Sequence, residues 1–233
     1  MNTNPPPTAP LYDVLNLESH VKQVNGTFWP PEHPSIAREI TNDTESQWQE
    51  FEKQRILPVT AAQLRAMGVD PSTASKLEDK DWGLGDDAYV AAMDVFHQLH
   101  CLNTLREMAY ADLYPKISKG RGDALWKNHI DHCVDILMQE IQCSANLNLF
   151  SYHWVADHDR PFPIFSINRQ CIDFDYLKRW RLENTIDMDK YNRVVRKPPG
   201  AKELHAADDW YEYSNVTNPN HSNGANPDQK FIQ

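Results

Sequence analysis

The sequence lacks any long apolar run and has few basic residues for its length. A membrane-spanning helix needs roughly 20 consecutive apolar residues, and the 233-residue chain contains no such run. Residues 1–10 also lack the basic and apolar segments of a signal peptide, so we expect a soluble chain. Acidic residues outnumber basic ones, 33 to 23, and the net charge is −10. Because an acidic surface repels phosphate backbones, nucleic-acid binding is not expected.

Glycine is also scarce, with 8 glycines against 16 prolines, so stiff and irregular connections are expected. We predict a mainly α-helical fold with two long helices, Pro-rich irregular segments and little β structure. The chain divides into a disordered lead over residues 1–24, one helical domain over 25–190 and a mostly disordered polar tail over 191–233.

Local signals predict where the helices begin and end. The two long helices are expected over residues 88–114 and 123–143, and shorter ones over 44–54, 60–67 and 174–183. The pairs Thr44/Gln47 and Thr60/Gln63 fit the capping-box pattern, and Asp173 fits an N-cap. Residues 149–170 are aromatic and interrupted by proline, which indicates a loop with one short strand at most.

Cysteines and glycosylation patterns bear on the cellular compartment. The four cysteines permit two disulfides, and four Asn-x-Ser/Thr patterns are candidate glycosylation sites. The acceptor residues are Asn25, Asn42, Asn215 and Asn220. These features favour a secretory lumen, a cytoplasmic location is the alternative, and the sequence leaves the choice open.

One short motif, His-x-x-His-Cys, occurs twice, at residues 97–101 and 129–133. Residues three and four positions apart share a face of a helix, so each copy presents two imidazoles and a thiol on one patch. A single such pair is more often structural than a ligand pair. Two identical copies within the two long helices instead favour a metal site, since helix bundles build such sites from facing helices. The candidate ligands are His97, His100, His129 and His132.

The position of the motifs along the helices raises a geometric question. The first motif lies farther from the connector than the second, by an offset of order 10 Å at the helical rise per residue. The helices must therefore be offset or cross at an angle. Otherwise the motifs would form two separate sites.

Several metals fit these ligands. Imidazole suits zinc, copper, iron and nickel, while four histidines without a carboxylate argue against the two-His-one-carboxylate iron site. Cys101 and Cys133 are further ligands, which would favour zinc or Cu(I), or they form a disulfide that joins the helices. Cys143 and Cys171 are the natural second disulfide, although the sequence leaves three pairings open.

Other residues near the motifs have two interpretations each. Asp94 and Asp131 are candidates for orienting imidazole rings, or else they lie on solvated helix faces. The aromatic cluster Tyr152, His153 and Trp154 is a candidate substrate pocket, or else a buried loop anchor.

The stretches MDVFHQLHCLNTLRE, HIDHCVDILMQEIQCSANLNLFSYHWV and CIDFDYLKRW resemble the fungal UstYa family over roughly residues 25–185. The resemblance implies an enzyme of mycotoxin or other secondary-metabolite biosynthesis. Such enzymes catalyse oxidative cyclisation of ribosomal peptides, or hydroxylation or chlorination of small molecules. It also implies copper as the cofactor, with O2 or a peroxide as oxidant. By position His97, His100, His129 and His132 would be the copper ligands, and the resemblance implies a homo-dimer or a hetero-dimer with a related protein as the candidate assembly.

The family commonly has an N-terminal membrane helix, and no such segment is visible in this sequence, so we expect either a soluble member or a sequence from which the anchor is missing. Two other functional classes compete with an oxidase. A structural zinc module for protein interaction would use the same ligands, and a hydrolase would need an accessible, low-pKa Cys–His pair. The hydrolase is the weaker alternative, because adjacent His100 and Cys101 point about 100° apart on a helix.

Overall fold

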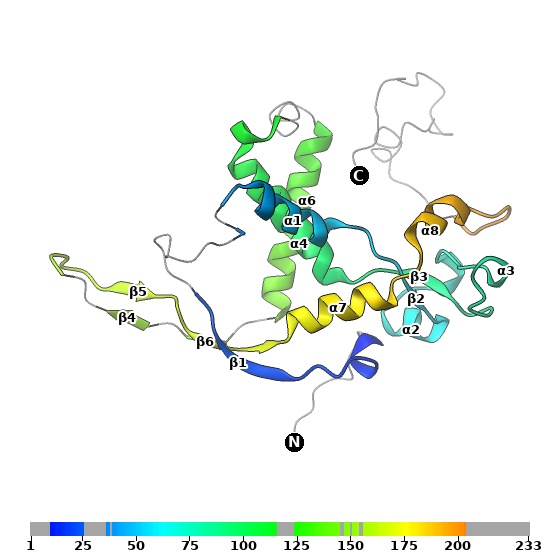
Figure 1. The fold of residues 1–233 in the computed structure, drawn as a ribbon, viewed down its shortest axis with the longest axis horizontal. Helices are drawn as coiled ribbons and strands as arrows, with labels where there is room; N and C mark the ends of the chain where they lie inside the picture. The colour runs from blue at the N-terminus through cyan, green and yellow to red at the C-terminus, as the bar shows by residue number, and fades with distance from the viewer. Residues whose placement is uncertain are drawn as a thin grey trace.

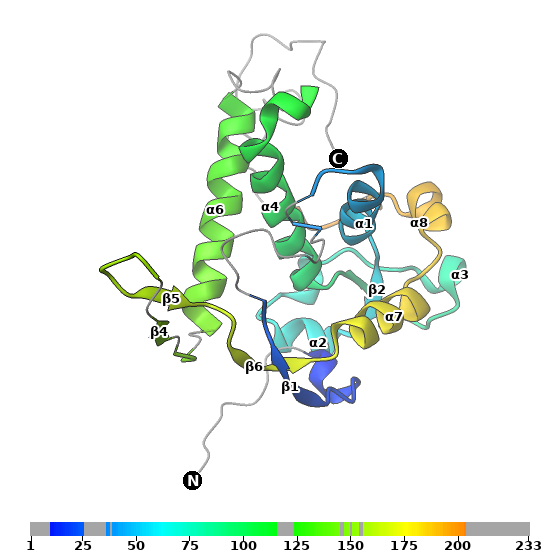
Figure 2. The ribbon, with the colours of Figure 1, turned by 60° about the vertical axis from the view of Figure 1, so that its left-hand side comes forward.

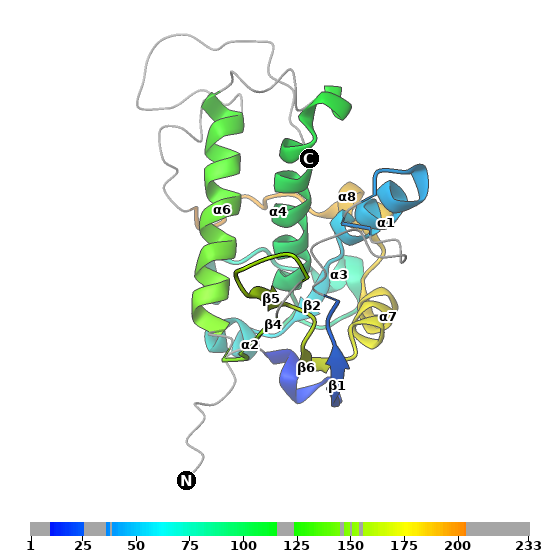
Figure 3. The ribbon, with the colours of Figure 1, turned by 90° about the vertical axis from the view of Figure 1, so that its left-hand side faces the viewer.

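The fold is mainly helical, as predicted, in a computed structural model that describes residues 10–25, 36–37, 39–115, 124–144, 147–149, 151–153 and 156–203. The two longest helices, α4 (Asp94–Ala109) and α6 (Ala124–Ser144), stand side by side, and α1 (Asn42–Glu52) packs on α4 (Figures 2 and 3). Helices α7 (Phe174–Asn184) and α8 (Met188–Val194) follow later in the chain (Figure 1). The remaining helical elements are short: η1 Pro10–Asp13, α2 Ala61–Ala66, η2 Pro71–Thr73, α3 Asp79–Trp82 and η3 Ala111–Leu113.

The described residues form three two-stranded antiparallel sheets, two of which join segments that are distant in sequence. Strand β1 (Ser19–Gln23) pairs with β6 (Asn168–Ile172), and β2 (Leu57–Val59) pairs with β3 (Tyr89–Ala91). Strand β4 (Ser151–His153) pairs with β5 (Phe162–Ile164) in a hairpin that projects from the body of the molecule (Figure 1). The expectation of one strand at most over residues 149–170 was therefore too low.

The buried core lies where the N-terminal segment, β2, the start of α4 and α7 meet. Its centre is the cluster Leu15, Leu57, Met93, Phe96 and Leu177, each less than a tenth exposed. Full burial of such a side chain is worth about 1.5–3 kcal/mol. The core therefore holds the first turn of α4 in place, directly before His97.

Local signals account for most helix boundaries, and two predictions needed correction. The capping box of α1 lies three residues earlier than predicted. It is formed by Thr41 and Thr44 rather than by Thr44 and Gln47. Helix α4 is shorter than 88–114, because Tyr89–Ala91 pairs with β2 as a strand and the helix ends at Ala109. The box of Thr60 and Gln63 and the N-cap Asp173 are confirmed.

The predicted lead and tail are described only in part. Within the lead, residues 10–23 include η1 and β1, because the β1 backbone pairs with β6. Helix α8 was not predicted, and it spans the predicted boundary between the helical domain and the tail at residue 190. The division into lead, domain and tail otherwise stays a prediction. None of the helices in the described ranges combines the length and apolar character that a membrane span requires.

Candidate metal centre

The two predicted motifs face one another across the α4–α6 pair. The ring centroids of His97 and His132 are 5.6 Å apart, as are those of His100 and His129. Along α4, the rings of His97 and His100 are 6.4 Å apart. Four imidazoles thus form one cluster of two facing pairs, and the fallback of two distant sites does not apply. The expected offset is reduced because α4 ends at Ala109 rather than near Tyr114.

One group within the cluster is tighter than the rest. Single ligand atoms of His97, Cys101 and His132 all lie within 4.8 Å of one another. The Nε2 atom of His97 is 3.8 Å from the Cys101 sulfur. Cys101 is fully buried, whereas both histidines are exposed. The thiol therefore lies on the buried side of this group, and the two imidazoles lie on its solvent-exposed side. Nitrogen and sulfur donors in this arrangement fit a transition-metal ion.

The four cysteines are free thiols in the structure. Cys101 and Cys133 are both fully buried between α4 and α6, whereas Cys143 is exposed and Cys171 half-buried. Both disulfides considered from the sequence stay predictions. Burial raises the pKa of the Cys101 thiol to about 12, and the neighbouring Cys133 adds to the rise. A buried thiol with a high pKa is a poor nucleophile, which argues against the Cys–His hydrolase.

Each of the two imidazoles on α4 has a carboxylate near its Nδ1 atom. The Nδ1 atom of His97 is 3.6 Å from the Asp94 carboxylate, and the orienting role of Asp94 stays a prediction. The Nδ1 atom of His100 is 3.3 Å from the carboxylate of Glu52, the last residue of α1. Asp131, the other candidate, forms an exposed ion pair with Lys127. Glu52 was missed because nothing in the sequence relates α1 to the motifs.

These contacts shift the titration of the cluster. The contact with Glu52 raises the pKa of His100. Burial lowers the pKa of His129, and the charges of the other three histidines lower it further. Burial alone would raise the pKa of Glu52, but its hydrogen bonds with His100 and Asn103 outweigh burial and lower it. The contact between Glu52 and His100 thus favours the charged form of each group.

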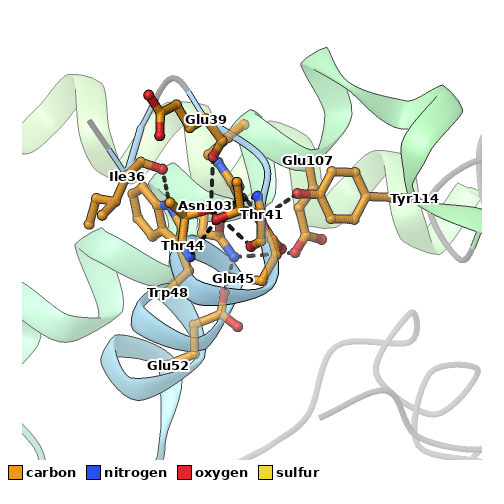
Figure 4. A network of polar contacts seen from close by, with 11 residues as sticks. Ile36, Glu39, Thr41, Thr44, Glu45, Trp48, Glu52, Asn103, Glu107 and Tyr114 are labelled. Atoms are coloured by element: carbon orange, nitrogen blue, oxygen red, sulfur yellow. Dashed lines mark hydrogen bonds and ion pairs between the residues drawn. The ribbon is translucent and has the colours of Figure 1, made fainter. Parts of the chain in front are cut away.

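A polar network continues from Glu52 into the α1–α4 interface (Figure 4). Asn103 donates to Glu52 at 2.8 Å and to Glu107 at 3.2 Å, and its oxygen accepts from Arg106 at 2.7 Å. Arg106 in turn forms a buried ion pair with Glu45. The side of the histidine cluster that faces α1 is thus fixed by hydrogen bonds rather than by apolar packing alone.

The remaining candidates lie away from the cluster or outside the described residues. Tyr152 is 57% exposed on the projecting β4–β5 hairpin. His153 ends strand β4 and Trp154 lies outside the described residues, so the pocket stays a prediction. Asn25 and Asn42 are exposed, as glycan acceptors must be. The acceptors Asn215 and Asn220 lie outside the described residues.

Fold and site together define a class of protein: a small helical protein whose two longest helices carry a cluster of four histidines suited to a metal ion. The sequence profile described as "Mycotoxin biosynthesis protein UstYa" matches residues 2–184. The chain belongs to the UstYa family, and the resemblance seen in the two motifs is confirmed.

Relatives in several fungi support the assignment. The chain is 38% identical to the UstYa family oxidase aprY of Aspergillus flavus over 194 residues, which are 80% of this chain and 58% of that relative. It is 31% identical to the UstYa family oxidase phomYc of Diaporthe leptostromiformis over 109 residues, 45% of this chain and 42% of that relative. It is 34% identical to the oxidase ustYa of Aspergillus flavus over 98 residues, 41% of this chain and 42% of that relative. The chain therefore spans less than two thirds of the length of these relatives, and no solved structure matches it significantly.

Proposed function

We propose that this protein is a copper-dependent oxidase of fungal secondary metabolism. Its reaction would be the oxidative cyclisation of a peptide or small-molecule intermediate, with C–H hydroxylation or halogenation as related outcomes. The relatives named as oxidases support the reaction class. The observation that carries the proposal is the cluster of four imidazoles on two facing helices, with the buried Cys101 thiol beside it.

The donor set fits copper. His97 and His132, with the Cys101 thiol beneath them, would hold an ion on the open side, and His100 with His129 would complete the set or hold a second ion. Copper bound there would supply one-electron redox chemistry, with O2 or a peroxide as the oxidant. The residues around it have simpler tasks. Asp94 and Glu52 orient imidazoles, and the exposure of His97 and His132 leaves room for a substrate to approach.

A structural zinc module for protein interaction is the second candidate. The tight group of two imidazoles and a buried thiol favours it, because zinc accepts the same nitrogen and sulfur donors. Zinc has no redox chemistry, so this candidate predicts stoichiometric zinc after purification and no change of oxidation state.

The two candidates separate in one experiment. Protein produced with copper and zinc supplied together is assayed for both metals, and its copper affinity is measured by competition with a chelator. Each single change of His97, His100, His129 or His132 to Ala should weaken copper binding at least tenfold. His20→Ala, on an exposed strand, is the matched control and should bind as wild type does. Full copper occupancy in the quadruple variant, or zinc alone in the wild type, would overturn the proposal.

A further inference from the structure

Glu52 reaches the histidine cluster from a helix that carries no part of the repeated motif. It ends α1, and its Oε1 atom lies 3.3 Å from Nδ1 of His100 and 2.8 Å from Nδ2 of Asn103. We propose that Glu52 is a positioning residue of the candidate metal centre, which holds His100 as the Nδ1–H tautomer and so leaves its Nε2 lone pair free to act as the ligand atom. The proposal rests on the proposed function, since it names a residue that serves the same site.

The tautomer follows from hydrogen-bond chemistry. An ionised carboxylate can only accept hydrogen bonds, so the Nδ1 atom of His100 must be the donor. A neutral imidazole with its proton on Nδ1 has its free lone pair on Nε2, which is then the ligand atom. Metal-binding histidines commonly donate their other ring N–H to a carboxylate, which fixes the ring and makes it a stronger ligand.

His97 shows the same division of its two nitrogens. Its Nδ1 atom is 3.6 Å from the Asp94 carboxylate, while its Nε2 atom is 3.8 Å from the Cys101 sulfur inside the cluster. The carboxylate therefore lies on the outer side of this ring and the ligand group on its inner side. The ring of His100 likewise has a carboxylate, that of Glu52, at Nδ1, and its centroid lies 5.6 Å from that of His129 within the cluster.

The carboxylate of Glu52 is itself held in place. Asn103, which is 2% exposed, donates to it, and Arg106 donates to the Asn103 oxygen at 2.7 Å. Arg106 is fixed by its ion pair with Glu45. A connected network of this kind orients its members more firmly than a single exposed contact does. Glu52 is therefore a fixed acceptor rather than a mobile surface acid.

Two measurements test the proposal, with Glu52→Gln as the variant and Glu50→Gln as the matched control. Glu50 lies on the same helix but is paired with Lys53 and Arg55. Loss of an outer partner typically weakens metal binding about 10–100-fold. We expect that loss in Glu52→Gln, together with a changed Cu(II) electron paramagnetic resonance spectrum. Glu50→Gln should keep both the affinity and the spectrum of the wild type.

The second measurement uses the metal-free wild type and needs no folded variant of Glu52. Long-range proton–nitrogen NMR correlations distinguish the two neutral tautomers, and His100→Gln assigns the ring. A dominant Nδ1–H form supports the proposal, and a dominant Nε2–H form overturns it. Copper affinity within threefold of wild type and an unchanged spectrum in Glu52→Gln would also overturn it. If the wild type binds no copper, the proposed function fails, while the tautomer still decides the role of Glu52.

Discussion

Arg106 is a buried guanidinium that ties α4 to α1. It pairs with Glu45, donates to Asn103 at 2.7 Å and lies 5.2 Å from the centroid of the Trp48 ring. Its side chain is 5% exposed, and that of Glu45 is 25% exposed. A buried pair adds little stability by itself, but removal of one partner leaves the other uncompensated.

The variant Arg106→Met should therefore lower the free energy of unfolding by about 3 kcal/mol, the lower part of the range for broken buried pairs, since Glu45 keeps some contact with water. Methionine retains the apolar bulk of the arginine side chain, so the decrease in the free energy of unfolding reflects the loss of the charged group. Chemical denaturation measures it. In a Glu45→Gln background the same change should cost less. A loss of under about 1 kcal/mol in the wild-type background would contradict the assigned role.

Tyr114 belongs to the same network and makes its contribution to stability depend on pH. Its hydroxyl donates to Glu45 at 2.9 Å, and burial together with this hydrogen bond raises its pKa from 10.0 to about 12. The pKa of Tyr114 is higher in the folded state than in the unfolded state. The contribution of Tyr114 to the free energy of unfolding is therefore fully present below pH 10 and is lost as the pH approaches 12.

The difference in unfolding free energy between wild type and Tyr114→Phe should accordingly stay constant up to about pH 10 and then close toward pH 12. Urea titrations at several pH values follow it, with the exposed Tyr110→Phe as control. A gap that widens above pH 10 would show that the sign is wrong.

At the scale of elements, α1 depends on its capping box. The Thr41 hydroxyl accepts from the Thr44 amide at 3.2 Å, and the Thr44 hydroxyl accepts from the Thr41 amide at 2.9 Å. Loss of such an N-cap costs about 1 kcal/mol. Thr41→Ala should lower the stability by about that amount, whereas Thr41→Ser should retain it. Equal midpoints for the two variants in a denaturant titration would rule out a stabilising cap.

The same box shows what sequence patterns resolve. The prediction named Thr44 and Gln47, but Thr41 is also a good N-cap, and the choice is decided by a bond outside the helix. Thr44 donates to the Glu39 carbonyl at 2.9 Å, which orients the chain before α1. At α2 and α7 the predicted N-caps, Thr60 and Asp173, were correct.

The histidine cluster could be predicted on α4 and α6, but its surroundings could not. The repeat places four histidines and two cysteines on helix faces by spacing alone, because side-chain direction in a helix is fixed by periodicity. Glu52 lies far from both motifs in the sequence, and its contact with His100 depends on how α1 crosses α4. The pattern likewise gave no sign that residues 89–91 would leave the helix to pair with β2.

At the scale of the whole molecule, the core and the metal centre occupy different parts of the fold. Leu15, Leu57 and Leu177 pack around the first turn of α4, whereas the histidines lie farther along, at its contact with α6. Helix α6 meets the rest of the described structure mainly through α4 (Figure 3). The metal-free protein should therefore fold cooperatively around its core, with α6 as the less firmly held helix.

Under the proposed function, copper bound between α4 and α6 should stabilise a protein that is already folded. A ligand that binds only the folded state adds about 2.7 kcal/mol at 100 times its dissociation constant, and a domain of this size gains about 2–4 °C per kcal/mol. We expect a rise of roughly 5–10 °C in Tm with copper, reversed by a chelator and absent from the quadruple histidine variant. Hydrogen exchange should show the added protection mainly in α6, since α4 is already anchored by the core. Protection confined to the core segments, or the same Tm with and without copper, would mean that the ion does not join the two helices.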